Sequence, residues 1–517
     1  MSVHRTWISL SLLLSFAVPG SFAQEAVVAS APRSDAYEAS FESLAKHKAA
    51  PEWFRDAKLG IYFHWGVYSV PAHQNEWYPR WMHFPGHHVQ KYHLKTYGPP
   101  NEFGYHDFVP QFKAENFDAT EWAELFQQAG AKFAGPVAEH HDGFAMWDSD
   151  ATIWNAADMG PKRDITGELE KEIRARGMKF IATFHHSRNL QRYADNPGEK
   201  DRKDIEARQR WFDSHFPNIP DTPPTSEDPR LRQLYGNMPE DVWLEMMWLA
   251  KLKEVIDQYE PDMIWFDAWL RAIPQEYQEK FAAYYLNRAK EQGRDVMIVR
   301  KNDDLPLEYS VNDFEKGRMA TLAKDPWLTD DTISKGSWCY TKGLAIKSLP
   351  DVLHVFIDIV SKNGCLLLNI SPKADGTIPE NQREVLLGLG KWLDQNGEAI
   401  YGTRPFVTFG EGPTRIEKGG HFLKQTKYTP QDIRYTLNGK GTGTFYAIQL
   451  GLPKPGEEVL LRKVPQYIVP MDYQVKKVTL LGSDAEVPWE SGNEGLSITV
   501  PEKLPNEVAL VWRIGVE

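Results

Sequence analysis

The sequence has little cysteine, no excess of basic charge and no later apolar segment long enough to cross a membrane. Only Cys339 and Cys365 occur among 517 residues, so a large hydrophobic core rather than disulfides has to stabilise the fold. We expect both thiols to be buried, although a bridge between them stays open at this point. After the N-terminal leader, no segment reaches about 18 uncharged apolar residues, which predicts no membrane span.

The charge balance excludes one large class of partner. The chain has 59 Lys and Arg against 71 Asp and Glu, a net charge of −12, whereas a nucleic-acid-binding surface has to be positive. Internal repeats and low-complexity tracts are also absent. What the chain does have is 18 tryptophans, whose flat apolar rings suit a carbohydrate ligand, although any single one is more readily a core residue.

The first 23 residues resemble a signal peptide. His4 and Arg5 give a basic start, an apolar stretch follows over Trp7–Val18, and Ser21-Phe22-Ala23 has the small-x-small pattern of a cleavage site. The sequence therefore predicts a mature chain that begins at Gln24 and is exported to the periplasm or the extracellular medium.

Residues 24–402 have the pattern of a (β/α)8 barrel of the TIM type. From about residue 50 onward, short β-rich segments alternate with longer helical segments, which is typical of a parallel sheet. The candidate strands are eight in number, as a barrel requires: Leu59–Phe63, Lys132–Ala138, Met178–Phe184, Asp262–Phe266, Asp295–Val299, Tyr309–Phe314, Ser337–Tyr340 and Cys365–Ile370.

Residues 403–517 have a different pattern. Short alternating segments such as Thr444–Leu450, Glu458–Leu461, Gln474–Leu481 and Glu507–Trp512 are separated by Gly, Pro and Asn turns. This spacing predicts a C-terminal all-β sandwich domain. Within the barrel, the polar stretch Asp195–Gln233 is expected to be a long loop at the rim.

Chemically active side chains follow the predicted strands. In a (β/α)8 barrel the C-terminal strand ends converge on the catalytic face, and these positions hold His64, His140, His141, Asp142, His185, His186, Asp267, Arg300 and Glu315. Eleven of the 16 histidines lie between residues 64 and 186. A pocket lined by imidazoles, carboxylates and aromatic rings is therefore expected.

Two chemistries fit this set of residues. Several His and an Asp could hold a catalytic metal, but no His-x-His pair follows the first strand, and the adjacent His140 and His141 should point to opposite faces if the strand continues. The other chemistry is glycoside hydrolysis, which uses two carboxylates around the scissile bond. Asp267 ends an apolar strand and is the natural nucleophile, unless it merely caps a helix.

Four ordered motifs resemble the α-L-fucosidases of glycoside hydrolase family 29: KLGIYFHWGVYSVP (58–71), NEWY (75–78), EHHDGF (139–144) and WFD (265–267). The resemblance covers residues 37–402. It implies a retaining exo-α-L-fucosidase that uses a covalent glycosyl-enzyme intermediate and neither metal nor cofactor. The implied substrates are fucosylated oligosaccharides or polysaccharides.

The resemblance also implies roles for single residues. Asp267 matches the nucleophile, and the positions that contact the sugar are matched by His64, Glu76, Trp77, His140, His141, Trp265 and Arg300. Related sequences have tyrosines where this chain has His185-His186-Ser187. His186 therefore either replaces a tyrosine contact or is a core histidine.

The general acid/base is harder to assign, because its position varies among such enzymes. The candidates are Asp303, Asp304, Glu308, Asp313 and Glu315. We favour Glu315, which follows the sixth predicted strand and could lie about 5 Å from Asp267, as retention requires. The alternative is a surface Glu315 paired with Lys316 or Arg318.

Several alternatives remain open at the level of the sequence. An α-L-galactosidase of the same fold would differ only in accepting a 6-hydroxyl group, which an apolar pocket rejects weakly. A non-catalytic carbohydrate-binding protein on this scaffold is a second alternative, and a metal hydrolase is a third. A sulfated glycan is a further hypothesis, because Arg side chains suit oxyanions and basic residues occur in the predicted rim loop: Arg188, Arg192, Lys200, Arg202, Lys203, Arg208 and Arg210.

Overall fold

Eight parallel strands close into a barrel in which each strand pairs with its neighbour in sequence and β8 pairs with β1. This is seen in a computed structural model, which describes residues 36–191, 215–219, 221–439, 441 and 443–517. The predicted (β/α)8 fold is confirmed. The strands are β1 Leu59–Phe63, β2 Phe133–Glu139, β3 Lys179–Phe184, β4 Met263–Phe266, β5 Met297–Lys301, β6 Val311–Asp313, β7 Trp327–Thr332 and β8 Gly364–Ile370.

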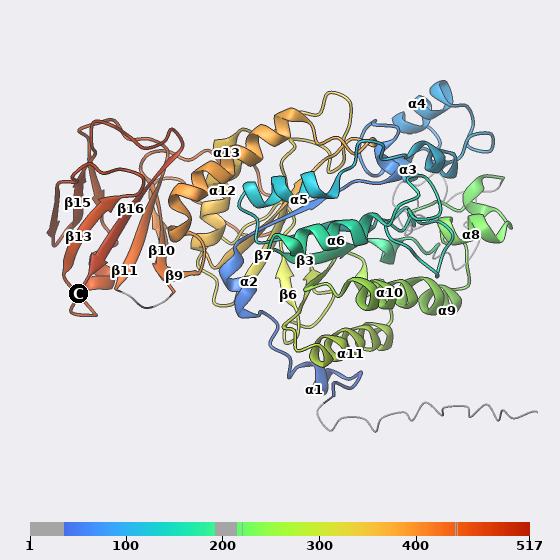
Figure 1. The fold of residues 1–517 in the computed structure, drawn as a ribbon, viewed down its shortest axis with the longest axis horizontal. Coiled ribbons are helices and arrows are strands. Elements are labelled where there is room, and N and C mark those ends of the chain that lie inside the picture. Colours follow the sequence, from blue (N-terminus) through green and yellow to red (C-terminus); the bar gives the residue numbers. More distant parts are fainter. Residues whose placement is uncertain (1–35, 192–214, 220, 440, 442) are drawn as a thin grey trace, which may run out of the picture. The chain divides into compact units, whose positions relative to one another are not determined.

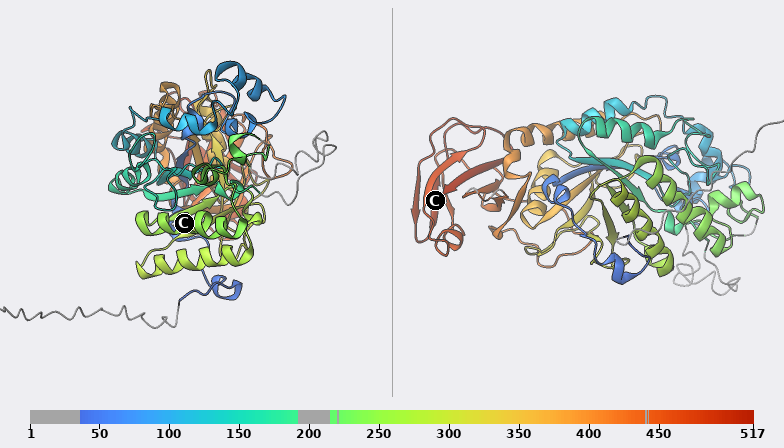
Figure 2. Two further views of the ribbon diagram at one scale, coloured as in Figure 1. Left: turned by 90° about the vertical axis from the view of Figure 1, so that its right-hand side faces the viewer. Right: turned by 60° about the horizontal axis from the view of Figure 1, so that its bottom comes forward.

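Helices surround the barrel strands (Figures 1 and 2). Side chains cap several of them: Asp118 accepts from the backbone of Thr120 at the start of α5, and Asp164 from that of Gly167 in α6, which satisfies N–H groups that lack a partner in the helix. The longer helices are α2 Glu52–Ala57, α4 His88–Thr96, α5 Ala119–Gln128, α6 Ile165–Ala175, α8 Pro229–Tyr235, α10 Ala250–Tyr259, α11 Gln275–Glu291, α12 Leu349–Ser361 and α13 Glu380–Asn396. Single turns are α1 Phe41–Leu44, α3 Tyr78–Trp81 and α9 Glu240–Trp243.

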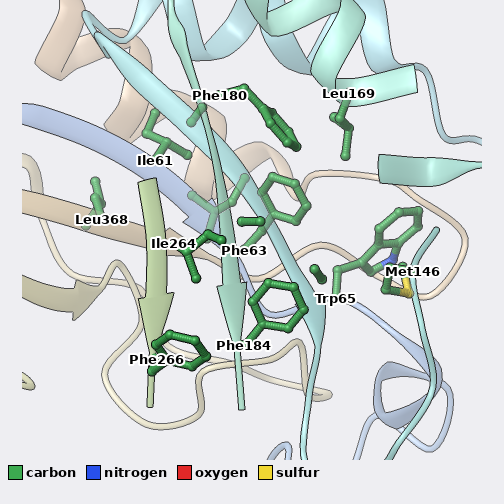
Figure 3. Packing of buried hydrophobic residues seen from close by; sticks show 14 of the residues in the cluster. Ile61, Phe63, Trp65, Met146, Leu169, Phe180, Phe184, Ile264, Phe266 and Leu368 are labelled. Carbon is green, nitrogen blue, oxygen red and sulfur yellow. The ribbon is translucent and has the colours of Figure 1, made fainter. Parts of the chain in front are cut away.

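The two faces of the barrel strands are buried in separate cores. Outward-facing residues pack against the helices, and Figure 3 shows part of this layer, including Phe184 of β3 and Phe266 of β4. Inward-facing residues such as Tyr62 of β1 and Trp265 of β4 fill the barrel interior. Strands buried on both faces read as continuous apolar segments, which is why most of them were recognised from the sequence.

The seventh strand was predicted wrongly. Ser337–Tyr340 forms no strand, and β7 is Trp327–Thr332 instead. Its sequence Trp-Leu-Thr-Asp-Asp-Thr contains two adjacent aspartates, residues that strands usually disfavour. Asp330 is nevertheless buried, with 1% of its surface exposed, because it contributes to the polar network described below.

The C-terminal part contains two antiparallel sheets that face each other across a second apolar core, which confirms the predicted sandwich. One sheet has the order β13-β16-β11-β10-β9 and the other β12-β15-β14. The strands are β9 Thr403–Glu411, β10 Asp432–Asn438, β11 Thr444–Leu450, β12 Glu458–Leu461, β13 Val475–Leu480, β14 Trp489–Gly492, β15 Gly495–Thr499 and β16 Ala509–Val516, with the short helix α14 Pro465–Ile468 between β12 and β13.

The larger sheet is also buried on its other face. Residues of β11 and β16, among them Ile448 and Val511, belong to the same core as the barrel helices, and Arg434 of β10 pairs with the buried Asp358 of α12 at 2.6 Å. Residues Tyr37–Glu517 accordingly form one compact unit. The predicted division into separate domains at residue 402 stays a prediction.

Both cysteines are free and buried, as expected. Among the residues that the structure describes, no helix is long and apolar enough to span a membrane. The predicted signal peptide and six of the seven basic residues of the rim loop, those between Arg192 and Arg210, lie outside the described residues.

Candidate active site

The inward-facing positions of the strands continue beyond the apolar core and become polar at one end of the barrel. On β4, Met263 and Trp265 face inward, and the next position in this alternation is Asp267. On β5, Met297 and Val299 lead in the same way to Lys301. Because side chains alternate along a strand, the apolar core itself determines which polar residues point into the barrel mouth.

A cavity of about 580 Å³ lies at this end of the barrel, and we call it the catalytic cavity. Seven strands or the loops that follow them contribute to it, together with the NEWY motif and a segment between β9 and β10. Its lining includes His64, Asn75, Glu76, Trp77, His140, His141, His185, Asp267, Trp269, Lys301, Glu315, Asp330, Trp338, His421 and Phe422.

Lys301 joins the two carboxylates that the sequence assigned to catalysis. Its Nζ lies 2.9 Å from Oδ1 of Asp267 and 3.0 Å from Oε2 of Glu315, so these two oxygens are no more than about 6 Å apart. The same Nζ is 3.3 Å from Oδ2 of Asp330, and it lies 4.7 Å from the ring centroid of Trp265. Trp265 is fully buried and supports the cavity from beneath.

The environment separates the pKa values of the two carboxylates. Burial by itself would raise the pKa of Asp267, but the ammonium of Lys301 and the contact with His141, whose Nε2 lies 3.3 Å from Oδ2, hold it well below its ordinary value. Burial raises the pKa of Glu315 to about 7 despite Lys301, and the charges of Asp330 and Asp267 add to this effect. Near neutral pH, Asp267 is ionised and Glu315 can carry a proton.

A second layer of polar groups holds Lys301 in place. Oδ2 of Asp330 accepts a hydrogen bond from the hydroxyl of Tyr62 at 2.9 Å, and the backbone N–H of Asp330 donates to Oδ1 of Asp313 at 2.8 Å. Burial, with the adjacent charge of Asp330, raises the pKa of Asp313 well above its usual range. Asp313 is therefore neutral, which leaves Lys301 as the charge partner of Asp330 and Asp267.

Four buried histidines form one wall of the cavity. Oδ1 of Asn369 accepts from Nδ1 of His64 at 2.8 Å, so in the neutral ring Nε2 of His64 is left as an acceptor. Burial lowers the pKa of His64 to about 4 and those of His140 and His185 well below the ordinary value. Neutral imidazoles can both donate and accept, which suits them to the hydroxyl groups of a sugar.

Aromatic rings and Glu76 complete the other walls. Oε2 of Glu76 accepts from the backbone N–H of Trp338 at 3.1 Å and from the hydroxyl of Ser337 at 3.2 Å. Trp77 lies with its ring centroid 5.1 Å from that of His141. The guanidinium of Arg188 lies over the rings of Trp77 and Trp269, at 4.8 Å and 3.9 Å.

The C-terminal part of the chain reaches the catalytic cavity, which sequence reasoning missed. His421 and Phe422 belong to the segment between β9 and β10. The backbone N–H of Glu315 donates to Nδ1 of His421 at 3.0 Å, and the N–H of Phe422 donates to the carbonyl oxygen of Glu315 at 2.7 Å. No local pattern around residue 421 signals this contact, because the partners are 106 positions apart.

Three predicted sugar-binding residues do not line the cavity. Trp265 belongs to the apolar core beneath it, whereas Arg300 and His186 are out of phase with the inward-facing positions. Arg300 precedes Lys301 on β5 and points outward, where its guanidinium contacts Leu305 and Asp303. His186 packs against Trp248 with its Nε2 3.3 Å from the carbonyl oxygen of that residue. His186 is thus a core histidine, and its neighbour His185 lines the cavity instead.

His140 and His141 do not point to opposite faces, because the strand does not continue through them. Both rings line the catalytic cavity, because β2 ends at Glu139 and the register with β3 shifts between Val137 and Glu139. The other acid/base candidates are placed elsewhere. Asp303 and Asp304 line a separate depression together with Arg300, Glu308 is exposed, and Asp313 is buried behind Asp330.

One cluster among the described residues could offer several ligands to a metal. Nitrogen atoms of His64, His140 and His185 all lie within 4.8 Å of one another. The same three residues line the cavity that contains Asp267, where neutral imidazoles are equally able to bind sugar hydroxyls. The metal hypothesis from the sequence therefore keeps a structural basis and is tested below.

A (β/α)8 barrel with two unequal carboxylates at its strand ends, surrounded by neutral histidines and tryptophans, defines a glycoside hydrolase. Comparisons with known proteins make the assignment specific. The profile of the family described as alpha-L-fucosidase matches residues 24–398, and that of the alpha-L-fucosidase C-terminal domain matches residues 425–516.

Similar proteins agree with these family matches. The tissue alpha-L-fucosidases of Rattus norvegicus and Homo sapiens are each 30% identical, over 88% and 90% of this chain and 87% and 88% of theirs. Among solved structures, the Thermotoga maritima α-fucosidase in complex with fucose has a TM-score of 0.68 at 27% identity, covering 92% of this chain and all of that one. The protein therefore belongs to the α-L-fucosidase family and has the function of an α-L-fucosidase.

Proposed function

We propose that the protein is exported and hydrolyses terminal α-L-fucosyl residues of glycans with retention of anomeric configuration, through a covalent intermediate on Asp267. The observation that carries this proposal is the contact of one ammonium, that of Lys301, with both Asp267 and Glu315. It limits the separation of their oxygens to about 6 Å, whereas inverting enzymes need about 6.5–9.5 Å to admit a water molecule.

In the first step, an Oδ atom of Asp267 attacks the anomeric carbon of the fucosyl residue. The bond between this carbon and the glycosidic oxygen breaks, and Glu315 gives its proton to the departing oxygen. In the second step, Glu315 takes a proton from water, whose oxygen attacks the anomeric carbon and releases Asp267. The low pKa of Asp267 and the raised pKa of Glu315 match these two roles.

The remaining cavity residues bind the sugar. His64, His140, His141 and His185 can hydrogen-bond its hydroxyls, and Glu76 offers a buried carboxylate. Trp77 and Trp338 provide apolar surface that suits a 6-methyl group. Apolar side chains fill the barrel interior beneath the cavity, so a glycan chain cannot pass through the barrel, which favours a terminal residue over one within a chain.

The covalent step is tested with 2-deoxy-2-fluoro-α-L-fucosyl fluoride, a reagent that slows the second step. Mass spectrometry of peptides should find one fluorofucosyl group on Asp267, and proton NMR of early products should show the α-anomer of the released sugar. A β-anomer would contradict retention, and a label on another carboxylate would contradict the assignment of Asp267.

Paired chromogenic α-L-fucoside and α-L-galactoside distinguish the remaining sugar specificities. A faster fucoside supports the proposal, whereas a faster galactoside would change the substrate but keep the mechanism. Cleavage of neither substrate would favour a carbohydrate-binding protein. Activity that survives dialysis against a chelator excludes a metal-dependent reaction at His64, His140 and His185.

Export is supported by the sequence of residues 1–23 alone. Expression of the full chain in a secreting bacterial host, followed by N-terminal sequencing of the protein outside the cytoplasm, should find a chain that starts at Gln24. An uncleaved chain that stays in the cytoplasm would contradict export.

A further inference from the structure

A second cavity, of about 600 Å³, adjoins the catalytic cavity, and we call it the basic cavity. It is lined by the loops that follow β6 and β7, by the start of α12 and by the segment between β9 and β10. Six of its lining residues are basic: Lys316, Arg318, Lys335, Lys347, Lys424 and Lys427. Among the described residues that line it, only Asp331 and Asp351 are acidic, although acidic residues outnumber basic ones in the chain.

Most of this positive charge is not neutralised within the described part of the chain. Lys347 pairs with Asp331 at 2.7 Å, and Asp351 caps α12 by accepting from the backbone N–H of Ser348. The other four lysines have no carboxylate within ion-pair distance among the described residues. Their combined field attracts an anion into the cavity.

Arg318 is fixed as part of the wall. Its guanidinium donates to the hydroxyls of Tyr428 and Thr426, at 2.9 Å and 2.8 Å, and to the carbonyl oxygen of Lys424. Only 3% of its surface is exposed. The segment between β9 and β10 is therefore tied to the loop after β6, and the lysines on it are held at the cavity rather than on a free loop.

The two cavities share a wall built from neighbouring residues. Glu315, Gly336 and Phe422 line the catalytic cavity, whereas the adjacent Lys316, Lys335 and Leu423 line the basic one. The basic cavity thus lies directly beside Glu315, the residue that protonates the departing group in the proposed mechanism. A sugar on the leaving-group side of the scissile bond is the part of a substrate that would extend in this direction.

In the shared wall, two backbone segments approach each other closely and two residues adopt unfavourable backbone conformations. A Cβ atom on Gly317 would lie 2.2 Å from the carbonyl oxygen of Gly420, so only glycine permits this approach. Lys316 and Phe422 both adopt left-handed backbone conformations, with φ of 46° and 53°, which are unfavourable for residues other than glycine and recur at functional sites. In this conformation Nζ of Lys316 lies 4.5 Å from the ring centroid of Trp338, between the two cavities.

We propose that the basic cavity binds an oxyanion, either a sulfate ester or a carboxylate, carried by the glycan on the leaving-group side of the scissile bond. The preferred substrate is then an anionic fucoglycan rather than a neutral one. This inference rests on the proposed function, since Glu315 defines the leaving-group side. It concerns residues outside the predicted rim loop and stands independently of the basic residues there.

The test compares three α-L-fucosyl disaccharides that differ only in the leaving sugar, which is neutral, carries a sulfate ester or is a uronic acid. The variant Lys335→Gln/Lys424→Gln/Lys427→Gln removes three exposed charges from the basic cavity. The control variant Lys391→Gln/Lys454→Gln/Lys503→Gln removes the same charge from exposed positions that do not line it. Thermal unfolding establishes that both variants fold.

For the wild type, kcat/KM on one anionic disaccharide should exceed that on the neutral one by about tenfold or more. The basic-cavity variant should lose most of this ratio, and the control variant should keep it. A preference for the sulfated substrate identifies a sulfate ester as the anion, and a preference for the uronic acid identifies a carboxylate. The same ratio in wild type and basic-cavity variant would overturn the inference.

Failure of the inference can be told apart from failure of the proposed function. Cleavage of a neutral chromogenic α-L-fucoside tests the proposed function without the basic cavity. If the wild type did not cleave it, calorimetric titration with the same three disaccharides would still decide the inference: tighter binding of an anionic form that the basic-cavity variant loses supports it, and equal binding of all three overturns it.

Discussion

The catalytic cavity and the basic cavity share a wall but handle charge in different ways. In the catalytic cavity, Lys301 is 3% exposed in its side chain and contacts three carboxylates at 2.9–3.3 Å. In the basic cavity, Lys335, Lys424 and Lys427 are exposed. The first set of charges is removed from water and fixed by strands, whereas the second is solvated and carried by loops.

This difference determines how each cavity can contribute to function. Buried charged groups have strongly shifted pKa values, because water no longer solvates the charge and the neighbouring protein groups determine its energy. Solvated lysines attract a ligand over a longer range but are screened by salt. Substitutions in the catalytic cavity should therefore lower kcat/KM by orders of magnitude or lower the free energy of unfolding. Substitutions in the basic cavity should change the preference between anionic and neutral substrates by a smaller factor.

The largest effect is expected for Asp267→Asn. The amide retains the shape of the side chain but cannot form the glycosyl ester, so kcat/KM on a chromogenic fucoside should fall by about 10⁴-fold. Asp303→Asn serves as the control, because Asp303 lies outside the cavity and its side chain is fully exposed. A fall of less than tenfold for Asp267→Asn would mean that another group is the nucleophile.

Glu315→Gln should have the next largest effect, and its pH dependence identifies the role. In the wild type, kcat/KM should decline as the pH rises through about 7, because Glu315 then loses the proton that it donates. The variant should lose about 10²-fold on a substrate with a poor leaving group, and much less on an aryl fucoside with a good one.

The decline of kcat/KM at high pH, compared between the wild type and Glu315→Gln, is the control within the same experiment. On the good leaving group, the decline near pH 7 should be absent in Glu315→Gln. A decline that persisted at the same pH would assign it to another group, and the acid/base role would then return to the remaining carboxylates.

Lys301→Met should mainly reduce stability. It removes an ammonium that contacts Asp267, Glu315 and Asp330 while keeping an unbranched side chain as long as the lysine stem up to Cε, so the free energy of unfolding should fall by about 3 kcal/mol. The pKa of Asp267 should rise without this neighbour, which moves the acidic limb of the pH profile to higher pH. Chemical denaturation measures the first effect and steady-state kinetics the second.

The exposed Lys342→Met provides the matched control. It should change the free energy of unfolding by no more than about 0.5 kcal/mol. An equal loss in both variants would mean that Lys301 contributes only a general surface charge, which would contradict the buried network.

The smallest expected effect is a difference in salt dependence between reactions that use the basic cavity and reactions that use the catalytic cavity alone. Raising the ionic strength from about 0.01 M to 0.5 M shortens the screening length severalfold. The rate on the anionic disaccharide should fall several times more than the rate on the neutral chromogenic fucoside, whose reaction depends on buried charges. Equal salt dependence would remove the distinction between the two cavities.

Much of this architecture could be predicted from local sequence. Seven of the eight barrel strands, the change to antiparallel strands after the barrel, and the convergence of Asp267, Glu315 and His64 at the strand ends follow from apolar segments and their order. Burial on both faces makes such segments visible. The missed strand, β7, is the one in which Asp330 and Asp331 interrupt the apolar pattern.

The two wrongly predicted cavity residues differ from the correct ones by one position along the strand, which reverses the side of the strand on which the side chain lies. Arg300 and His186 lie at the ends of strands in the sequence, but it is Lys301 and His185 that continue the inward-facing positions of β5 and β3. Alternation could have identified both, once the inward face of each strand was known.

The sequence by itself determined the barrel, the C-terminal sandwich and the place of Asp267 at the end of a strand, because these depend on short apolar patterns and on residues at their ends. Only the tertiary structure decided that one lysine joins the two carboxylates, that His421 and Phe422 close the catalytic cavity, and that lysines from three separate segments surround a second one. Such contacts join residues 14 to 106 positions apart on different strands and loops, and their geometry is fixed by packing across the whole barrel rather than by any local pattern.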